Sequence, residues 1–81
     1  NKIEHKIVYY NTSIIIVKVD SILKTIPWKS VLYIETEHNF NFSGENIIKL
    51  SLILGKNFSI DLIIEEDIKD EILNIYKKNN Q

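Results

Sequence analysis

Two alternating apolar runs on either side of a short loop constrain this fold more than any other feature. The runs "IIKLSLIL" (47–54) and "FSIDLII" (58–64) carry apolar residues at every even position and are separated only by "GKN". This pattern predicts an antiparallel hairpin with one buried face. With a three-residue loop over 55–57, every apolar residue of one strand faces an apolar residue of the other. A two-residue turn would instead pair Leu52 with Ser59. The predicted pairs are Leu54–Phe58, Leu52–Ile60 and Leu50–Leu62, with Ser51 opposite Asp61 and Asn57 suited to a left-handed loop conformation.

The preceding run, 31–42, has the same phase and predicts a long strand that joins this hairpin. A turn through Ser43, Gly44 and Glu45 would place it beside 47–54. Phe40 and Phe42 could form an exposed aromatic tip, but their phase favours the core. The even positions that we expect on the shared face are Leu32, Ile34, Thr36, His38, Phe40 and Phe42.

Three shorter runs at the N-terminal end also read as strands. "IEHKIVYY" (3–10) and "SIIIVKV" (13–19) predict a hairpin over Asn11 and Thr12, and "ILKTI" (22–26) predicts a short third strand. The run 13–19 is apolar on both faces. We expect it to be an edge strand that needs cover from a partner or a second copy.

After residue 65 the apolar period changes from two to that of a helix. "EEDIKDEILNIYKK" (65–78) carries an apolar stripe and acids before bases, the order that the helix dipole favours. We expect Asp67 to cap the N-terminus, with Asp70 and Glu71 in the first turn and Lys77 and Lys78 in the last. The stripe consists of Ile68, Ile72, Leu73, Ile75 and Tyr76. The fold class is therefore α+β, mainly β: an antiparallel meander of about six strands, closed by one C-terminal helix.

Composition narrows the function. Eighty-one residues make a single domain over 1–81, and the net charge of −1, with ten lysines and no arginine, disfavours nucleic-acid binding. Without cysteine there is no disulfide framework or thiolate zinc site. No run is long enough to span a membrane and no signal peptide opens the chain. Because residue 1 is asparagine, we expect the chain to be a fragment of a longer protein.

No catalytic or metal-binding pattern is present, so we expect neither enzyme activity nor a cofactor. His5 and His38 do not form a metal-ligand pair, and both are in phase with core residues. The acidic run 65–67 is explained by the start of the helix. There is no G-x-S-x-G nucleophile elbow and no phosphate-cradling glycine loop.

The order of these elements resembles a known family. Ile26-Pro27-Trp28, followed by Val31 and Ile34, is similar to the "iPW-x-x-I-x-x-I" segment of bacterial pleckstrin-homology-like domains, relatives of the PH/GRAM superfold. The resemblance covers about residues 7–78 and implies a PH-like, partly open barrel closed by the helix. The superfold has seven strands, one more than the sequence indicates here.

The resemblance suggests lipid binding as a function, but the residues do not support it. Phosphoinositide-binding PH domains use a basic cluster with arginine at the first hairpin, but here that turn is the uncharged "YYNTSI". Specific phosphoinositide binding is therefore not expected, and membrane-surface binding is weak at most. Lys18, Lys24 and Lys29 either gather near Trp28 as a weak basic patch or are scattered and solvated, and the sequence favours the second.

Pro27 and Trp28 have two interpretations. Proline suits a strand end or corner, and tryptophan can plug a barrel where a strand bends. The alternative is that Trp28 contacts a partner. We favour the structural role, and we retain Trp28 as a candidate partner-binding residue.

The sequence thus favours a non-enzymatic binding or assembly module that acts by protein–protein contact, including self-association. It would be cytoplasmic, either free or as the cytoplasmic domain of a membrane protein. The candidate partner-binding residues are Ile14, Ile16, Lys18, Lys24, Trp28 and Lys29. The alternatives are a DNA-binding β-module of a transcription regulator, against which the charge argues, and a small hydrolase or metal-dependent domain.

Overall fold

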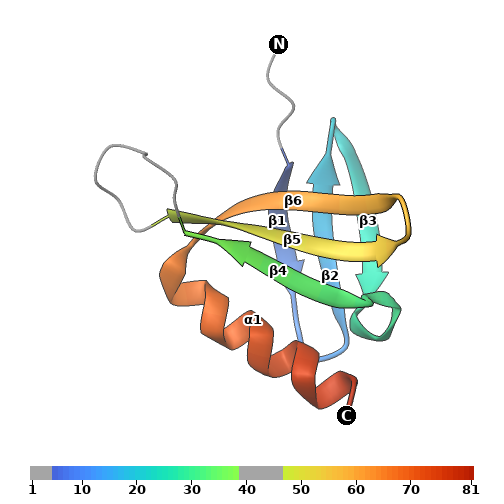
Figure 1. The fold of residues 1–81 in the computed structure, drawn as a ribbon. Coiled ribbons are helices and arrows are strands. Elements are labelled where there is room, and N and C mark those ends of the chain that lie inside the picture. The colour runs from blue at the N-terminus through green and yellow to red at the C-terminus, as the bar shows by residue number, and fades with distance from the viewer. Residues whose placement is uncertain (1–4, 39–46) are drawn as a thin grey trace.

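The chain folds into two three-stranded antiparallel sheets and a C-terminal helix, in a computed structural model that describes residues 5–38 and 47–81 (Figure 1). Sheet A contains β1 (His5–Tyr10), β2 (Ile14–Val19) and β3 (Ile22–Pro27). Sheet B contains β4 (Tyr33–Glu37), β5 (Ile47–Gly55) and β6 (Phe58–Glu65). A 3₁₀ turn, η1 (Trp28–Ser30), links the sheets, and α1 (Glu66–Asn79) follows β6. The predicted α+β class with antiparallel strands and a C-terminal helix is confirmed.

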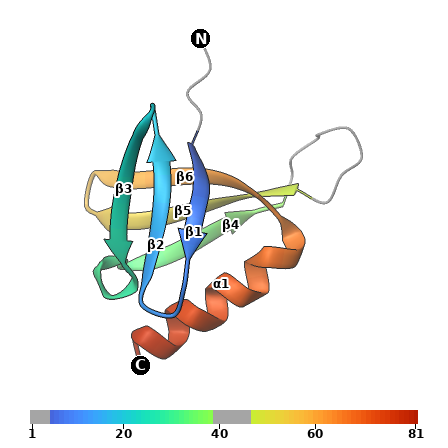
Figure 2. The same ribbon diagram turned by 180° about the vertical axis from the view of Figure 1, so that it is seen from behind.

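The two sheets cross and enclose the core between their inner faces (Figures 1 and 2). The strand order is β1-β2-β3 in one sheet and β4-β5-β6 in the other, so the predicted meander is divided at η1. β1 lies against β6 where the sheets meet, and α1 packs on η1, β5 and β6. The helix thereby covers an open end between the sheets.

Each sheet, the connection and the helix contribute apolar side chains to one core. Alternation along the strands turns every second side chain inward, as antiparallel sheets with one solvated face require. The buried residues are Ile15, Val17, Ile26, Trp28, Val31, Ile48, Leu50, Leu52, Ile60, Leu62, Ile64 and Ile72.

The β5–β6 hairpin has the predicted register except at its tip. Leu50 pairs with Leu62, Ser51 with Asp61 and Leu52 with Ile60, as predicted. The predicted Leu54–Phe58 pair is wrong, because the register shifts between Ile53 and Gly55 and sets Gly55 opposite Phe58. The shift turns Phe58 outward, where it is 53% exposed. The predicted three-residue loop over 55–57 is also wrong: β5 extends to Gly55, and only Lys56 and Asn57 connect it to β6. Asn57, which was suited to a left-handed conformation, does not have a positive φ.

β4 joins β5 on the predicted face but starts later than predicted. Ile34 lies opposite Leu52 and Thr36 opposite Leu50. Leu32 is 59% exposed, not in the core, because the chain is still leaving η1 there. The predicted turn 43–45, together with Phe40 and Phe42, lies outside the described residues.

The strand 14–19 is central, not an edge strand as predicted. β2 pairs with β1 on one side and with β3 on the other. A run that is apolar on both faces does not tell whether the strand lies at the edge or in the middle of its sheet. Here β1 and β3 pair with its two edges, and the core covers the face of Ile15 and Val17. The β1–β2 turn is fixed by Asn11, whose Oδ1 accepts hydrogen bonds from the amides of Ser13 (2.8 Å) and Ile14 (2.9 Å).

α1 begins two residues earlier than an Asp67 cap would require. Its N-cap is Glu65, without a capping side-chain hydrogen bond, and Glu66 and Asp67 lie in the first turn. The predicted Asp67 cap, with Asp70 and Glu71 in the first turn, is therefore wrong. β6 runs directly into the helix, which leaves no connecting residue for a polar cap. Four of the five stripe residues face the core, with Ile72 fully buried and Ile68, Ile75 and Tyr76 packed against the core. Leu73 is not among the residues packed there.

Pro27 and Trp28 form the corner between the sheets. Pro27 ends β3, and Trp28 is fully buried. The indole Nε1 donates to the Asn11 carbonyl oxygen (2.8 Å), and the Trp28 amide donates to the Ser13 carbonyl oxygen (3.1 Å). These bonds tie the β1–β2 turn to η1. The structural role of Trp28 is confirmed, and no part of its side chain is exposed to a partner.

Candidate binding surface

The side of sheet A that faces away from the core carries apolar and basic side chains. Ile15 and Val17 point inward and are fully buried, so the alternate residues of β2 point outward. The register sets Tyr9 opposite Ile16, and it sets Lys18 between Lys6 and Leu23. We call this surface the outer face of sheet A. It is defined by Lys6, Tyr9, Ile14, Ile16, Lys18 and Leu23.

This face is more apolar than a solvated sheet face normally is. Antiparallel sheets usually alternate apolar-in and polar-out, but here Tyr9 is 51% and Leu23 62% exposed, beside the half-buried Ile14 and Ile16. Figure 2 shows β1, β2 and β3 in front, with no other described element across them. Clustered apolar side chains on an uncovered face are typical of protein-interaction sites.

Of the predicted site residues, the structure brings Ile14, Ile16 and Lys18 together on this face. Lys24 pairs with Val17 and has the inward phase of β3, although it is exposed at the sheet edge. Lys29 lies in η1, beyond the other end of β3. The three lysines and Trp28 therefore do not form one patch.

Two lysines stand side by side on the outer face of sheet A. Lys6 and Lys18 are cross-strand partners, an arrangement in which like charges repel. Among the described residues, no carboxylate lies within salt-bridge distance of either lysine. This end of the face is therefore positive and is not neutralised within the described part of the fold.

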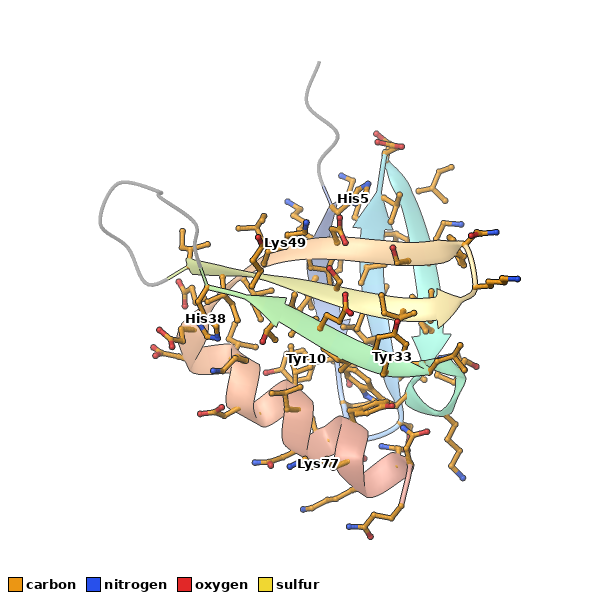
Figure 3. The ribbon with its side chains drawn as sticks, viewed as in Figure 1. His5, Tyr10, Tyr33, His38, Lys49 and Lys77 are labelled. Carbon is orange, nitrogen blue, oxygen red and sulfur yellow. The ribbon has the colours of Figure 1, made fainter. Side chains whose placement is uncertain are left out.

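The outer face of sheet B has a different character. Ser51 Oγ donates to Asp61 Oδ1 (2.7 Å), and Lys49 Nζ lies 3.6 Å from Asp61 Oδ2 and 3.7 Å from Glu37 Oε1. Figure 3 shows Lys49 and Tyr33 towards opposite ends of this sheet. We define the outer face of sheet B by Tyr33, Glu35, Glu37, Lys49, Ile53 and Asp61, which carry three acids and one base.

The histidines do not assemble a reactive centre. His5 Nδ1 lies 3.2 Å from the Asp61 carbonyl oxygen, where β1 meets β6. His38, just after β4, has its Nδ1 3.9 Å from Glu66 Oε2, and both side chains are about half exposed. Within residues 5–38 and 47–81, no group of three or more His, Asp or Glu side chains could hold a metal ion.

A groove of about 510 Å³ lies beside the outer face of sheet A, between β1 and β6. Its lining includes Val8 and Tyr9 of β1, Ile63 and Ile64 of β6, and Ile68 of α1. The lining is mostly apolar and is continuous with the outer face of sheet A at Tyr9. The groove extends the surface that a partner could contact.

The comparisons with known proteins give no relative. No protein-family model, no curated protein and no solved structure matches the chain. Among the described residues, no helix has the length and apolar character needed to cross a membrane.

Sequence reasoning missed Tyr9, Leu23 and the acidic face. Tyr9 is hidden by a bulge in β1 between Ile7 and Tyr9, which the alternation does not reveal. Leu23 belongs to a short run with apolar residues on both faces, so its direction depends on the β2–β3 register. The acids of β4 were visible, as the odd positions of "YIETE", but the sequence does not show which surface they face.

Proposed function

We propose that the chain is a non-enzymatic protein-binding module that acts through the outer face of sheet A. The observation that carries the proposal is the exposure of Tyr9 and Leu23 on an uncovered sheet face, beside the half-buried Ile16 and Ile14 of β2. The proposal keeps the expected protein–protein contact but replaces its mechanism. A partner would cover the face of β2 instead of pairing with its edge.

Burial on such a face contributes free energy to a contact with a partner. Covering a Leu or Phe-sized side chain completely is worth about 1.5–3 kcal/mol, so several half-exposed ones together offset part of the cost of association. Aromatic residues such as Tyr9 are enriched at interfaces, because the ring provides apolar area while the hydroxyl stays solvated. Lys6 and Lys18 would favour a partner surface with carboxylates.

We also propose that the architecture is a PH-like barrel with one strand fewer than the superfold. Two antiparallel sheets that cross, and a C-terminal helix that covers their open end, support this assignment. As in the sequence analysis, we place the module in the cytoplasm, with the cytoplasmic face of a membrane protein as the setting if segments outside this chain anchor it.

Site-specific photo-crosslinking tests the binding surface. A photoreactive amino acid replaces Leu23 in one variant and Asn74, on the exposed side of α1, in the matched control. We expect crosslinks to a second polypeptide from position 23 in the source cells, and their loss when Ile16→Lys is added. Equal crosslinking from position 74, no protein adduct from position 23, or crosslinks to nucleic acid alone would contradict the proposal.

A further inference from the structure

The two outer faces carry opposite charge on opposite sides of the molecule. Figure 1 shows sheet B in front, and Figure 2, turned by 180°, shows sheet A in front. The outer face of sheet A contributes two lysines and no acid, whereas the outer face of sheet B contributes Glu35, Glu37 and Asp61 against Lys49. Because α1 covers neither outer face, each is accessible to a second molecule.

Within the outer face of sheet B, the acids are only partly neutralised. Lys49 is shared between Glu37 and Asp61, whose side chains remain 59% and 52% exposed. Among the described residues, Glu35 has no cation within salt-bridge distance. The face therefore retains negative charge that a basic surface could neutralise.

The apolar parts of the two faces are also complementary. On sheet A, Tyr9 and Ile16 lie along the strands from the Lys6–Lys18 pair. On sheet B, Tyr33 and Ile53 are paired at the end of the ladder away from Glu37 and Lys49. Each face thus has an apolar end with an exposed tyrosine. At the other end, charged side chains lie beside one exposed aliphatic residue, Leu23 on sheet A and Ile63 on sheet B. A single docking can therefore set lysine against carboxylate and apolar against apolar.

We propose that the partner is a second copy of this chain, whose outer face of sheet B docks on the outer face of sheet A. This inference rests on the proposed function, since it names the partner of the same surface. The contact is heterologous: each molecule uses one face to bind and offers the other to the next copy. Because the faces lie on opposite sides, association continues into an open series instead of closing as a dimer.

The size of the faces predicts a weak, reversible and salt-sensitive contact. Three strands about 4.8 Å apart and six residues with a rise of about 3.3 Å cover roughly 300 Å². Stable interfaces bury about 800 Å² on each partner. The lysines and carboxylates of these faces are exposed, so rising ionic strength screens the attraction between them.

Two charge-reversal variants test the inference. In the basic-face variant, Lys6→Glu is combined with Lys18→Glu. In the acidic-face variant, Glu35→Lys is combined with Glu37→Lys. The matched control, Lys77→Glu with Lys78→Glu, makes the same charge change as the basic-face variant in the last turn of α1. Circular dichroism confirms that each variant is folded before its mass is measured by light scattering over a tenfold concentration range at low salt.

The expected results follow from the faces that each variant retains. Wild type and the control should exceed the 9.5 kDa monomer mass increasingly with concentration, whereas each face variant alone should stay at that mass. An equimolar mixture of the two face variants should associate again with rising concentration, because the reversed lysine and carboxylate faces complement each other as the unaltered faces do.

Three results would overturn the inference: a monomeric wild type, association of either face variant alone, or a mixture that stays monomeric. A monomeric wild type that still crosslinks from position 23 to another protein would contradict only the self-association. Loss of that crosslink as well would contradict the proposed function.

Discussion

Sheets A and B are alike inside and different outside. Each has three antiparallel strands and an inner face of buried aliphatic side chains. Both outer faces carry some exposed apolar residues, but their polar groups differ: those of sheet B are hydrogen-bonded and ion-paired, while sheet A carries two unneutralised lysines. Because buried apolar contacts contribute most of the free energy of folding, we expect the composition of the outer face of sheet A to matter less for folding than the inner faces. We therefore relate it to binding.

The largest expected effect tests whether the two sheets are one cooperative unit. Trp28→Ala removes the side chain that fills the corner between them and its hydrogen bond to Asn11. We expect a loss of about 3–5 kcal/mol in the free energy of unfolding, most of what a chain of this size possesses. Urea unfolding followed by tyrosine fluorescence and by circular dichroism should give coincident transitions, or a chain already unfolded in water. Two separate transitions would mean that the sheets are independent.

Substitutions at two neighbouring residues of β2 compare the contributions of the inner and outer faces to stability. Ile15→Ala leaves a cavity among fully buried side chains and should cost about 3 kcal/mol. Ile16→Ala truncates a half-buried side chain on the outer face and should cost less than about 1 kcal/mol. Chemical denaturation checks both values, and equal losses would show that the outer face of sheet A also serves the fold.

A substitution with a smaller expected effect on stability tests the polar outer face of sheet B. Ser51 is 8% exposed, and its hydroxyl is bonded to Asp61. Ser51→Ala should lower the free energy of unfolding by about 1 kcal/mol, measured by thermal denaturation. Ser59→Ala, at an exposed position of the same sheet, is the matched control and should have almost no effect.

The smallest effect concerns the contact between sheet A and α1. Tyr10 Oη donates to Glu71 Oε1 (2.6 Å), and this hydrogen bond, with burial and the Glu71 charge, raises the pKa of Tyr10 above its usual value near 10. The raised pKa means that the folded state favours the neutral phenol. The stabilisation is therefore complete below pH 10 and is lost as the pH rises through the folded-state pKa.

Tyr10→Phe removes this titration and makes the prediction measurable. The difference in melting temperature between wild type and the variant should be constant between pH 7 and 9, and it should shrink above pH 10. Because the group is near the surface, the difference itself should correspond to less than about 1 kcal/mol. A difference that does not change with pH would contradict the role of the Glu71 bond.

The inner faces were predictable from the sequence, and the outer faces were only partly so. Period-two alternation is sufficient to pair Leu50 with Leu62 and Leu52 with Ile60, because any other register buries polar residues. It fails at Phe58, where a one-residue register shift reverses the direction of the side chain. Bulges depend on local backbone geometry, which an alternating pattern does not encode.

The candidate surface required information that a linear pattern lacks. Ile14, Ile16 and Lys18 were identified as candidate binding residues, but for an edge strand that proves to be central. Their grouping with Tyr9 and Leu23 depends on which strands flank β2 and in what register. Trp28 was correctly assigned to the corner, because proline beside a large apolar residue has a local structural reason.

The central claim is that the outer faces of the two sheets bind each other in separate molecules. Proton–nitrogen correlation spectra recorded during a tenfold dilution at low ionic strength test it most directly. The account predicts concentration-dependent shifts on both faces together, at Tyr9, Ile16 and Leu23 and at Glu35, Glu37 and Ile53, with the last turn of α1 unchanged. Shifts confined to one face would indicate a symmetric dimer, and spectra that do not change on dilution would indicate no self-association. Either result would contradict the account.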